Sequence, residues 1–164
     1  MRRVSLVLLA SVSALVAGPA LAQAPQVEKN VSMAMAMAII QGTLEQCTKD
    51  GYKVSVVVVD KAGNVMASIK GDGTNPHTME FAKMKAYTAR TRGQSSLDFV
   101  QTTSTPEGAM LKQIPGLVAI GGGVPVKLTN GETIGAVGAS GAPGGEKDDA
   151  CVKAGIAKVA DQLK

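Results

Sequence analysis

Apolar side chains recur at helical spacing in three segments of the chain. The first segment ends before Gly51, because glycine commonly stops a helix. The second begins at Asn75 and Pro76, which suit the capping and first helical positions, and the third spans residues 146–163. The apolar stripe that we expect to bury the first helix leaves Met35 aside and consists of Met33, Met37, Ile40, Leu44 and Cys47.

Strand-like patterns lie between these helical segments. Residues 53–60 are β-branched and almost continuously apolar, which predicts a strand covered on both faces. Residues 65–70 follow after a short turn, and residues 124–128 and 133–140 flank an Asn-Gly turn, so each pair predicts a hairpin. The apolar run at residues 117–120 predicts a fifth strand.

Two short helices, at residues 95–100 and 106–112, complete the expected order, which is α-β-β-α-(α-α)-β-β-β-α. Hairpins with helices before, between and after them predict an α/β protein with a five-stranded antiparallel sheet. Because the first strand is apolar on both sides, we expect helices on both faces of that sheet.

The first residues have the pattern of a secretory leader. Arg2 and Arg3 precede an apolar run at residues 4–16, and Ala20-Leu21-Ala22 fits a cleavage site. The apolar run is too short to span a bilayer, which disfavours the alternative of a permanent N-terminal anchor. We therefore expect residues 1–22 to be a signal peptide.

After cleavage, residues 23–30 would form a polar lead-in and residues 31–164 a single domain. The chain carries 17 basic and 13 acidic side chains, and two basic ones lie in the leader. The mature net charge of about +2 is no electrostatic footprint for nucleic acid. With two Phe, two Tyr and no Trp, stacking platforms for bases are not evident either. We expect a periplasmic or secreted protein with no nucleic-acid partner and no membrane span.

The two cysteines, Cys47 and Cys151, predict a disulfide, because export places them in an oxidising compartment. A bond between them would set the first and last helices antiparallel on one face of the sheet. The strands at residues 53–60 and 133–140 would then lie antiparallel beneath them. Two buried free thiols are the alternative. The pair has neither C-x-x-C spacing nor a His/Cys cluster suited to zinc.

Three stretches of the sequence resemble the GlcG/HbpS-type haem-binding family, which includes the C-terminal domain of PduO corrinoid proteins. "DGTNPHTMEFAKMKAYTA", from Asp72, is similar to the family motif D-G-x(4)-S/T-x(3)-A-x-x-K-A-x-T-A. "LVAIGGGVPV", from Leu117, resembles its glycine-containing strand pair, and "TIGAVGASGAPGGEKDDACVKAGI", from Thr133, resembles its last strand, glycine-rich loop and last helix. The resemblance covers almost all of residues 31–164 in order.

The resemblance implies a profilin-like or roadblock-like sandwich of five antiparallel strands, assembled into a homo-oligomer. It also implies haem or a related tetrapyrrole as cofactor and, in some exported members, a part in haem or redox sensing. It fixes no axial ligand, because the iron ligand varies within the family.

His77 is the only histidine of the chain and lies within this motif. Imidazole commonly ligates haem iron, so His77 is the best candidate metal ligand, with Phe81 beside it on the helix to cover a porphyrin edge. The alternative is an exposed residue at the edge of a loop. Lesser ligand candidates are Met79, Met84 and Tyr87.

Lys85 matches the lysine of the motif, and an inward position would let it pair with Asp60 or Asp72, or with a haem propionate. A lysine that extends along the surface is the alternative. Glycines 121–123 could present backbone N–H groups to an anion, although turns and close packing explain them better. The expected ligand-binding set is His77, Thr78, Phe81, Lys85, Gly122 and Gly123.

These observations favour an exported tetrapyrrole-binding protein with a sensing, scavenging or accessory role. A second hypothesis is a periplasmic enzyme or accessory factor that acts on a small organic acid or aldehyde, through Lys85 and the glycine-rich loops. A third is a purely structural oligomer. Enzyme activity is less expected, because the sequence shows no Ser/His/Asp or Cys/His set.

Overall fold

The structure is a computed structural model that describes residues 24–164, so the expected signal peptide lies outside the described residues. Within the described part, no helix is long and apolar enough to cross a membrane. The helices are α1 (Met33–Lys49), α2 (Thr78–Arg92), α3 (Ser96–Thr102), α4 (Pro106–Ala109) and α5 (Gly145–Ala157), with 3-10 turns η1 (Met110–Gln113) and η2 (Ala160–Gln162). The strands are β1 (Ser55–Asp60), β2 (Val65–Lys70), β3 (Gly123–Lys127) and β4 (Thr133–Ser140).

The described strands form one antiparallel sheet in the order β2-β1-β4-β3. The antiparallel sheet is confirmed, but the prediction of a fifth strand at residues 117–120 is wrong. That segment lies beside α2, where the Val118 N–H donates to the Thr88 hydroxyl at 2.9 Å instead of joining the sheet. Leu117 is buried but Ile120 is 38% exposed, so burial accounts for only part of this apolar run.

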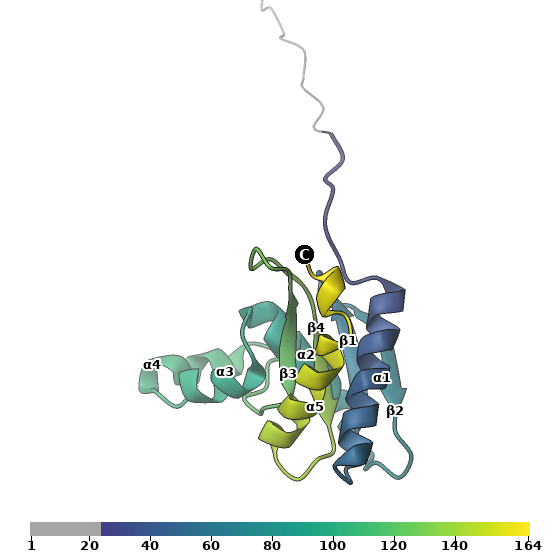
Figure 1. Ribbon diagram of the computed structural model, residues 1–164. Coiled ribbons are helices and arrows are strands. Elements are labelled where there is room, and N and C mark those ends of the chain that lie inside the picture. The colour runs from purple at the N-terminus through teal and green to yellow at the C-terminus, as the bar shows by residue number, and fades with distance from the viewer. Residues whose placement is uncertain (1–23) are drawn as a thin grey trace, which may run out of the picture.

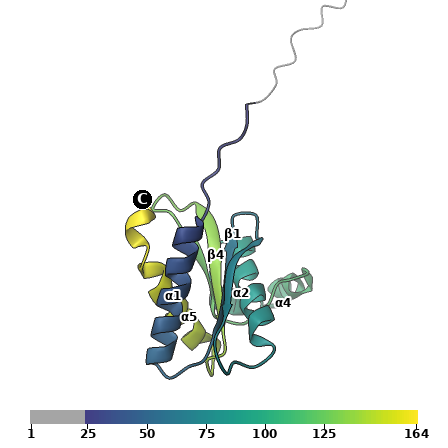
Figure 2. The same cartoon turned by 90° about the vertical axis from the view of Figure 1, so that its right-hand side faces the viewer.

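Helices cover both faces of the sheet, as expected (Figures 1 and 2). α1 and α5 lie side by side on one face, and α2 lies across the other. The side chains of β1 alternate between the two cores. Val56 and Val58 pack with α1 and α5, whereas Val57 and Val59 pack with the alanines of α2. As we inferred, this strand is continuously apolar because helices cover both of its faces.

α2 packs closely on the sheet because both surfaces are small. A Cβ at Gly138 would lie 2.7 Å from the backbone nitrogen of Ala86 and would also meet the carbonyl oxygen of Ala82. Glycine in β4 therefore lets the backbone of α2 approach the strand.

The expected apolar stripe of α1 is wrong in part. Met35 is buried at 8% exposure, whereas Met33 and Met37 are 53% and 46% exposed. The buried face of α1, which packs on the sheet and on α5, runs through Met35, Ala36, Ile39, Ile40, Gly42, Thr43 and Cys47. The segment "MAMAMA" is apolar on adjacent stripes, so spacing alone could not select the buried one.

The disulfide between Cys47 and Cys151 is present and buried, with 5.4 Å between the two Cα atoms. It joins the end of α1 to the first turns of α5, and these helices run antiparallel (Figure 1). β1 and β4 are antiparallel as well. The arrangement that we inferred from the cysteines is thus confirmed.

Two helix boundaries differ from the prediction. α2 begins at Thr78 with His77 as its capping residue, because the Thr78 N–H and hydroxyl both bond to the Asn75 carbonyl in a turn before the helix. The last helix ends at Ala157 and is followed by η2, not by a continuous helix to residue 163.

Candidate functional site

The start of α2 presents the histidine of the chain to solvent. His77 is exposed, and its ring centroid lies 5.5 Å from that of the half-buried Phe81, with the planes at 86°. This edge-to-face contact restrains the imidazole against an aromatic ring that is itself held by the helix. Together the two rings form a surface that offers both an apolar contact and an imidazole nitrogen.

Thr78 fixes the position of this surface. It is 1% exposed, and its hydroxyl lies 2.8 Å from the Ser55 hydroxyl and 2.8 Å from the Asn75 carbonyl oxygen. The side chain therefore points into the protein and ties the first turn of α2 to the start of β1. By holding this turn in place, Thr78 helps to orient the neighbouring His77.

Two clefts open beside the loop that leads into His77, and Lys53 lines both of them. The first, of about 430 Å³, is bounded by Gly73 and Asn75 on one side and by Gly141 on the other. The second, also about 430 Å³, lies between the end of α1 and Asp72. Two of the three stretches that carried the family resemblance, those that begin at Asp72 and at Thr133, thus meet around one exposed basic side chain.

Gly73 is required at this place. Its φ is +69°, and a Cβ there would lie 3.0 Å from the Lys53 Nζ, so the lysine side chain lies across the glycine. The ammonium of Lys147 lies 5.5 Å from the ring centroid of Tyr52, which lines both clefts. Lys53 and Lys147 give this end of the molecule two positive charges.

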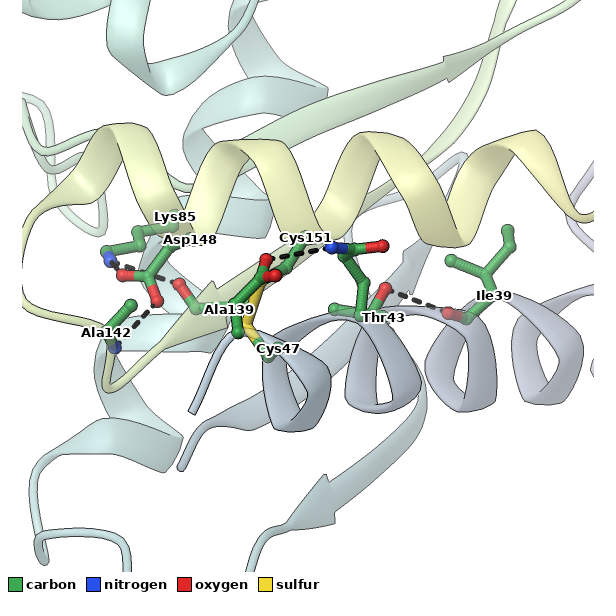
Figure 3. The surroundings of a disulfide bond; sticks show 10 residues. Ile39, Thr43, Cys47, Lys85, Ala139, Ala142, Asp148 and Cys151 are labelled. Atoms are coloured by element: carbon green, nitrogen blue, oxygen red, sulfur yellow. Dashed lines mark hydrogen bonds and ion pairs between the residues drawn. A yellow bond between two sulfur atoms is a disulfide. The ribbon is translucent and has the colours of Figure 1, made fainter. Parts of the chain in front are cut away.

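Lys85 points inward, which confirms one of our two interpretations (Figure 3). It is 2% exposed and donates to the Asp148 carboxylate at 2.7 Å and to the Ala139 carbonyl at 3.0 Å. Asp60 and Asp72, the partners that we expected, are not its partners. The ion pair connects α2 on one face of the sheet with α5 on the other.

Asp148 is held by several groups in addition to Lys85. Its second carboxylate oxygen accepts from the Ala142 N–H at 3.0 Å, which fixes the glycine-rich loop to α5. Burial raises the pKa of the Asp148 carboxyl, and the Lys85 ammonium and the backbone N–H groups oppose that shift.

Gly122 and Gly123 lie where Lys85 passes the end of the sheet. A Cβ at Gly122 would be 2.6 Å from the Asp148 Cβ and 3.0 Å from the Lys85 Nζ, and one at Gly123 would meet the Lys85 carbonyl oxygen. The Gly123 N–H donates to the Ser96 hydroxyl at 2.8 Å. These glycines therefore serve close packing, the explanation that we favoured.

The six expected ligand-binding residues fall into two groups. Lys85, Gly122 and Gly123 lie together and are buried, whereas His77 and Phe81 lie together at the surface, beside the buried Thr78. Eight residues of helix separate His77 from Lys85, which corresponds to about 12 Å along the axis. One ligand group cannot bond to both without reaching along two turns of α2.

Residues 31–157 of the chain match the family described as "Haem degrading protein HbpS-like". The chain belongs to this family. Protein GlcG of Escherichia coli strain K12 is 32% identical over 110 residues, which are 67% of this chain and 81% of GlcG.

Solved structures of this family have the same fold. The double mutant of HbpS from Streptomyces reticuli has a TM-score of 0.78 and 31% identity, over 86% of this chain and 96% of that one. A complex of PduOC with haem has a TM-score of 0.70 at 22% identity, over 79% and 94% of the two chains, and supports the fold alone. The resemblance that the sequence motifs indicated is therefore confirmed.

One site residue of this HbpS-like chain escaped the sequence reasoning. Asp148 lies in the first turn of its helix, where the helix dipole alone would explain an acid, yet it is buried and bonded to Lys85. The available signal was its spacing, because Asp148 shares a helix face with Cys151 and Gly155, both of which are buried. Among the described residues, no cluster of three or more His, Cys, Asp or Glu side chains could hold a bare metal ion.

Proposed function

We propose that this HbpS-like protein binds haem at the exposed start of α2, with His77 as the iron ligand. The observation that carries the proposal is the contact between the exposed imidazole and Phe81, in a chain of a family described as haem-degrading. Imidazole nitrogen is a common axial ligand of haem iron.

The residues present suit a haem group. His77 offers nitrogen, Phe81 offers an apolar face, and the exposed Lys53 offers a positive charge for a propionate. When bound, haem supplies a redox-active iron, and the chain's own residues bind it and orient it. Thr78 and the Lys85–Asp148 pair support the site by fixing α2 on the sheet.

The biological role that we propose is that of an exported homo-oligomer that senses or scavenges haem or assists another haem protein. The pattern of residues 1–22 supports export to the periplasm or the medium. The disulfide supports it as well, because such bonds persist mainly in oxidising compartments.

A hemin titration tests the haem site. Hemin is added to the purified protein, and the Soret band is followed to saturation. We expect saturable binding at one site per chain and, for His77→Ala, binding weaker by at least about tenfold. Glu80→Ala, a change of an exposed side chain on the same helix, is the matched control and should bind as the wild type does.

The outcomes separate the ligand from the site. If the wild-type protein gives no saturable Soret shift, haem binding is wrong. If His77→Ala and Glu80→Ala bind hemin equally well, haem binding stands and the assignment of His77 is wrong. Loss of the Soret band over time with a reductant would show haem degradation by this chain.

A second candidate function is the binding of a small organic acid or aldehyde. The observation that favours it is the pair of clefts beside the exposed Lys53. Lys85 is not the residue that would bind the acid, because its ammonium is already bonded to Asp148. Calorimetric titration with two-carbon and three-carbon hydroxy acids tests it, and Lys53→Ala should abolish any heat of binding. Binding that survives in Lys53→Ala would place the acid elsewhere.

A further inference from the structure

Three of the eight methionines of the chain lie at one corner of the molecule, where α1 runs beside β2 (Figure 1). Met33 and Met37 are one turn apart on α1 and are 53% and 46% exposed. Met66 belongs to β2, is half-buried and packs against the apolar core beneath α1. We call these three residues the thioether cluster.

One hydrogen bond fixes where Met66 lies relative to α1. The Asn30 side chain, just before α1, accepts from the Lys61 N–H at 3.0 Å, so the helix begins at the turn between β1 and β2. β2 leaves that turn with Val65 and Met66, which therefore lie beside the first turns of α1. Residues four positions apart on a helix have Cβ atoms about 5–6 Å apart, and methionine side chains are flexible. The three sulfur atoms can thus gather around one ion.

Core packing does not explain the two exposed methionines of α1. Met35, which lies between them in the sequence, is the one that faces the core, at 8% exposure. Met33 and Met37 remain about half in water, and Met37 also lines an open groove of about 810 Å³. An ion from solvent can therefore reach these thioether groups directly.

The chemistry of the cluster selects one class of ion. Thioether sulfur is a soft, uncharged ligand, and it prefers Cu(I) to hard cations such as Mg²⁺ or Ca²⁺. Within the described residues no cysteine is free to compete, because Cys47 and Cys151 form the disulfide. His77, the one histidine of the chain, lies at the start of α2, and α2 covers the other face of the sheet (Figure 2). The α1 face thus offers sulfur without a competing imidazole.

We infer that the thioether cluster binds one Cu(I) ion. Met33 and Met37 donate sulfur from α1 and Met66 donates it from β2, so the ion connects the helix with an edge strand of the described sheet. A thioether has no proton to lose, so binding should be nearly independent of pH, unlike binding by an imidazole. This inference goes beyond the proposed haem site and does not depend on it.

Competition with the chelator bicinchoninate measures the affinity of the protein for Cu(I), which is kept reduced with ascorbate. We expect one ion per wild-type chain at about pH 5.5 and at about pH 7.5, on either side of the usual pKa of a histidine. The paired variant Met33→Leu, Met37→Leu keeps apolar side chains of similar volume, so the fold should survive. It should bind at least about tenfold more weakly, since even groups outside the ligand shell contribute that much. Met110→Leu, at an exposed methionine outside the cluster, is the matched control and should bind as the wild type does.

Nuclear magnetic resonance identifies the atoms that bind the ion. In protein with isotope-labelled methionine methyl groups, the resonances of Met33, Met37 and Met66 should shift on addition of Cu(I). Those of Met110 and of the His77 ring should stay in place. This pattern is the one that an ion held by the thioether cluster produces.

Several results would overturn the inference. A wild type that takes no Cu(I) from the chelator would do so, and so would equal binding by the wild type and the paired leucine variant. Shifts confined to the His77 ring would place the ion on imidazole, and equal shifts at every exposed methionine would show unspecific binding. Hemin titration of the paired leucine variant should match the wild type, which keeps this site apart from the proposed haem site. Loss of hemin binding in that variant would place haem at the cluster and contradict the Cu(I) assignment.

Discussion

The Lys85 ammonium lies 2.7 Å from the Asp148 carboxylate, and both side chains are 3% exposed. The pair joins α2, which covers one face of the sheet, to α5, which covers the other. It passes the end of β3 at a position where Gly122 leaves room for it. The two helix layers are therefore connected by a charged contact in addition to the two apolar cores.

Breaking this pair should cost more than replacing it. Asp148→Ala leaves Lys85 buried without its partner, and we expect the free energy of unfolding to fall by about 3–5 kcal/mol. The double variant Lys85→Met, Asp148→Leu buries no charge and should lose much less. Urea denaturation measures both, with the exposed Glu146→Ala as control. Equal losses in the single and double variants would contradict this account.

The stability contributed by Asp148 should depend on pH. Because burial raises its pKa in the folded protein, the native state favours the protonated carboxyl relative to the unfolded chain. The part of this stability that depends on protonation of Asp148 is therefore fully present below the unfolded pKa and is lost as pH rises through the higher folded pKa. The difference in unfolding free energy between wild type and Asp148→Asn should shrink over that rise. A difference that grows with pH would show that Lys85 outweighs burial.

Much of this fold was predictable because its signals are local. The continuous apolar run at residues 53–60 indicated a strand between two helix layers, and the Asn-Gly turn at residues 130–131 indicated the hairpin of β3 and β4. The run at residues 117–120 has the same local character as a strand. Only its hydrogen bond to Thr88, a contact far along the chain, distinguishes it.

The candidate site was predictable only in part, because it also depends on contacts between residues that are far apart in the chain. The motif identified Lys85, and its small neighbours allowed an inward position as well as a surface one. Its partner Asp148 is 63 residues away, and an acid in the first turn of a helix already has a local explanation. The sequence could indicate that Lys85 needs an acid, but not which one the topology would supply.

Close packing of α2 on β4 should make Gly138 intolerant of a side chain. In Gly138→Ala the added Cβ would meet the backbone of Ala82 and Ala86, so the helix must move away from the strand. We expect a loss of about 1–3 kcal/mol in unfolding free energy, the range for an overpacked core. Gly131→Ala, at an open turn position with φ of +88°, measures the cost of backbone strain alone. No measurable loss in Gly138→Ala would contradict the packing argument.

Reduction of the disulfide should destabilise the fold strongly, because the bond joins residues that are 104 positions apart. In the chain-entropy model, a loop of that length corresponds to about 4–5 kcal/mol of stabilisation. We expect the paired variant Cys47→Ser, Cys151→Ser to unfold at much lower urea concentration than the oxidised wild type. Adding a reductant should shift the wild type toward the variant while leaving the variant unchanged. A wild-type midpoint that is insensitive to reductant under unfolding conditions would show that the bond contributes nothing.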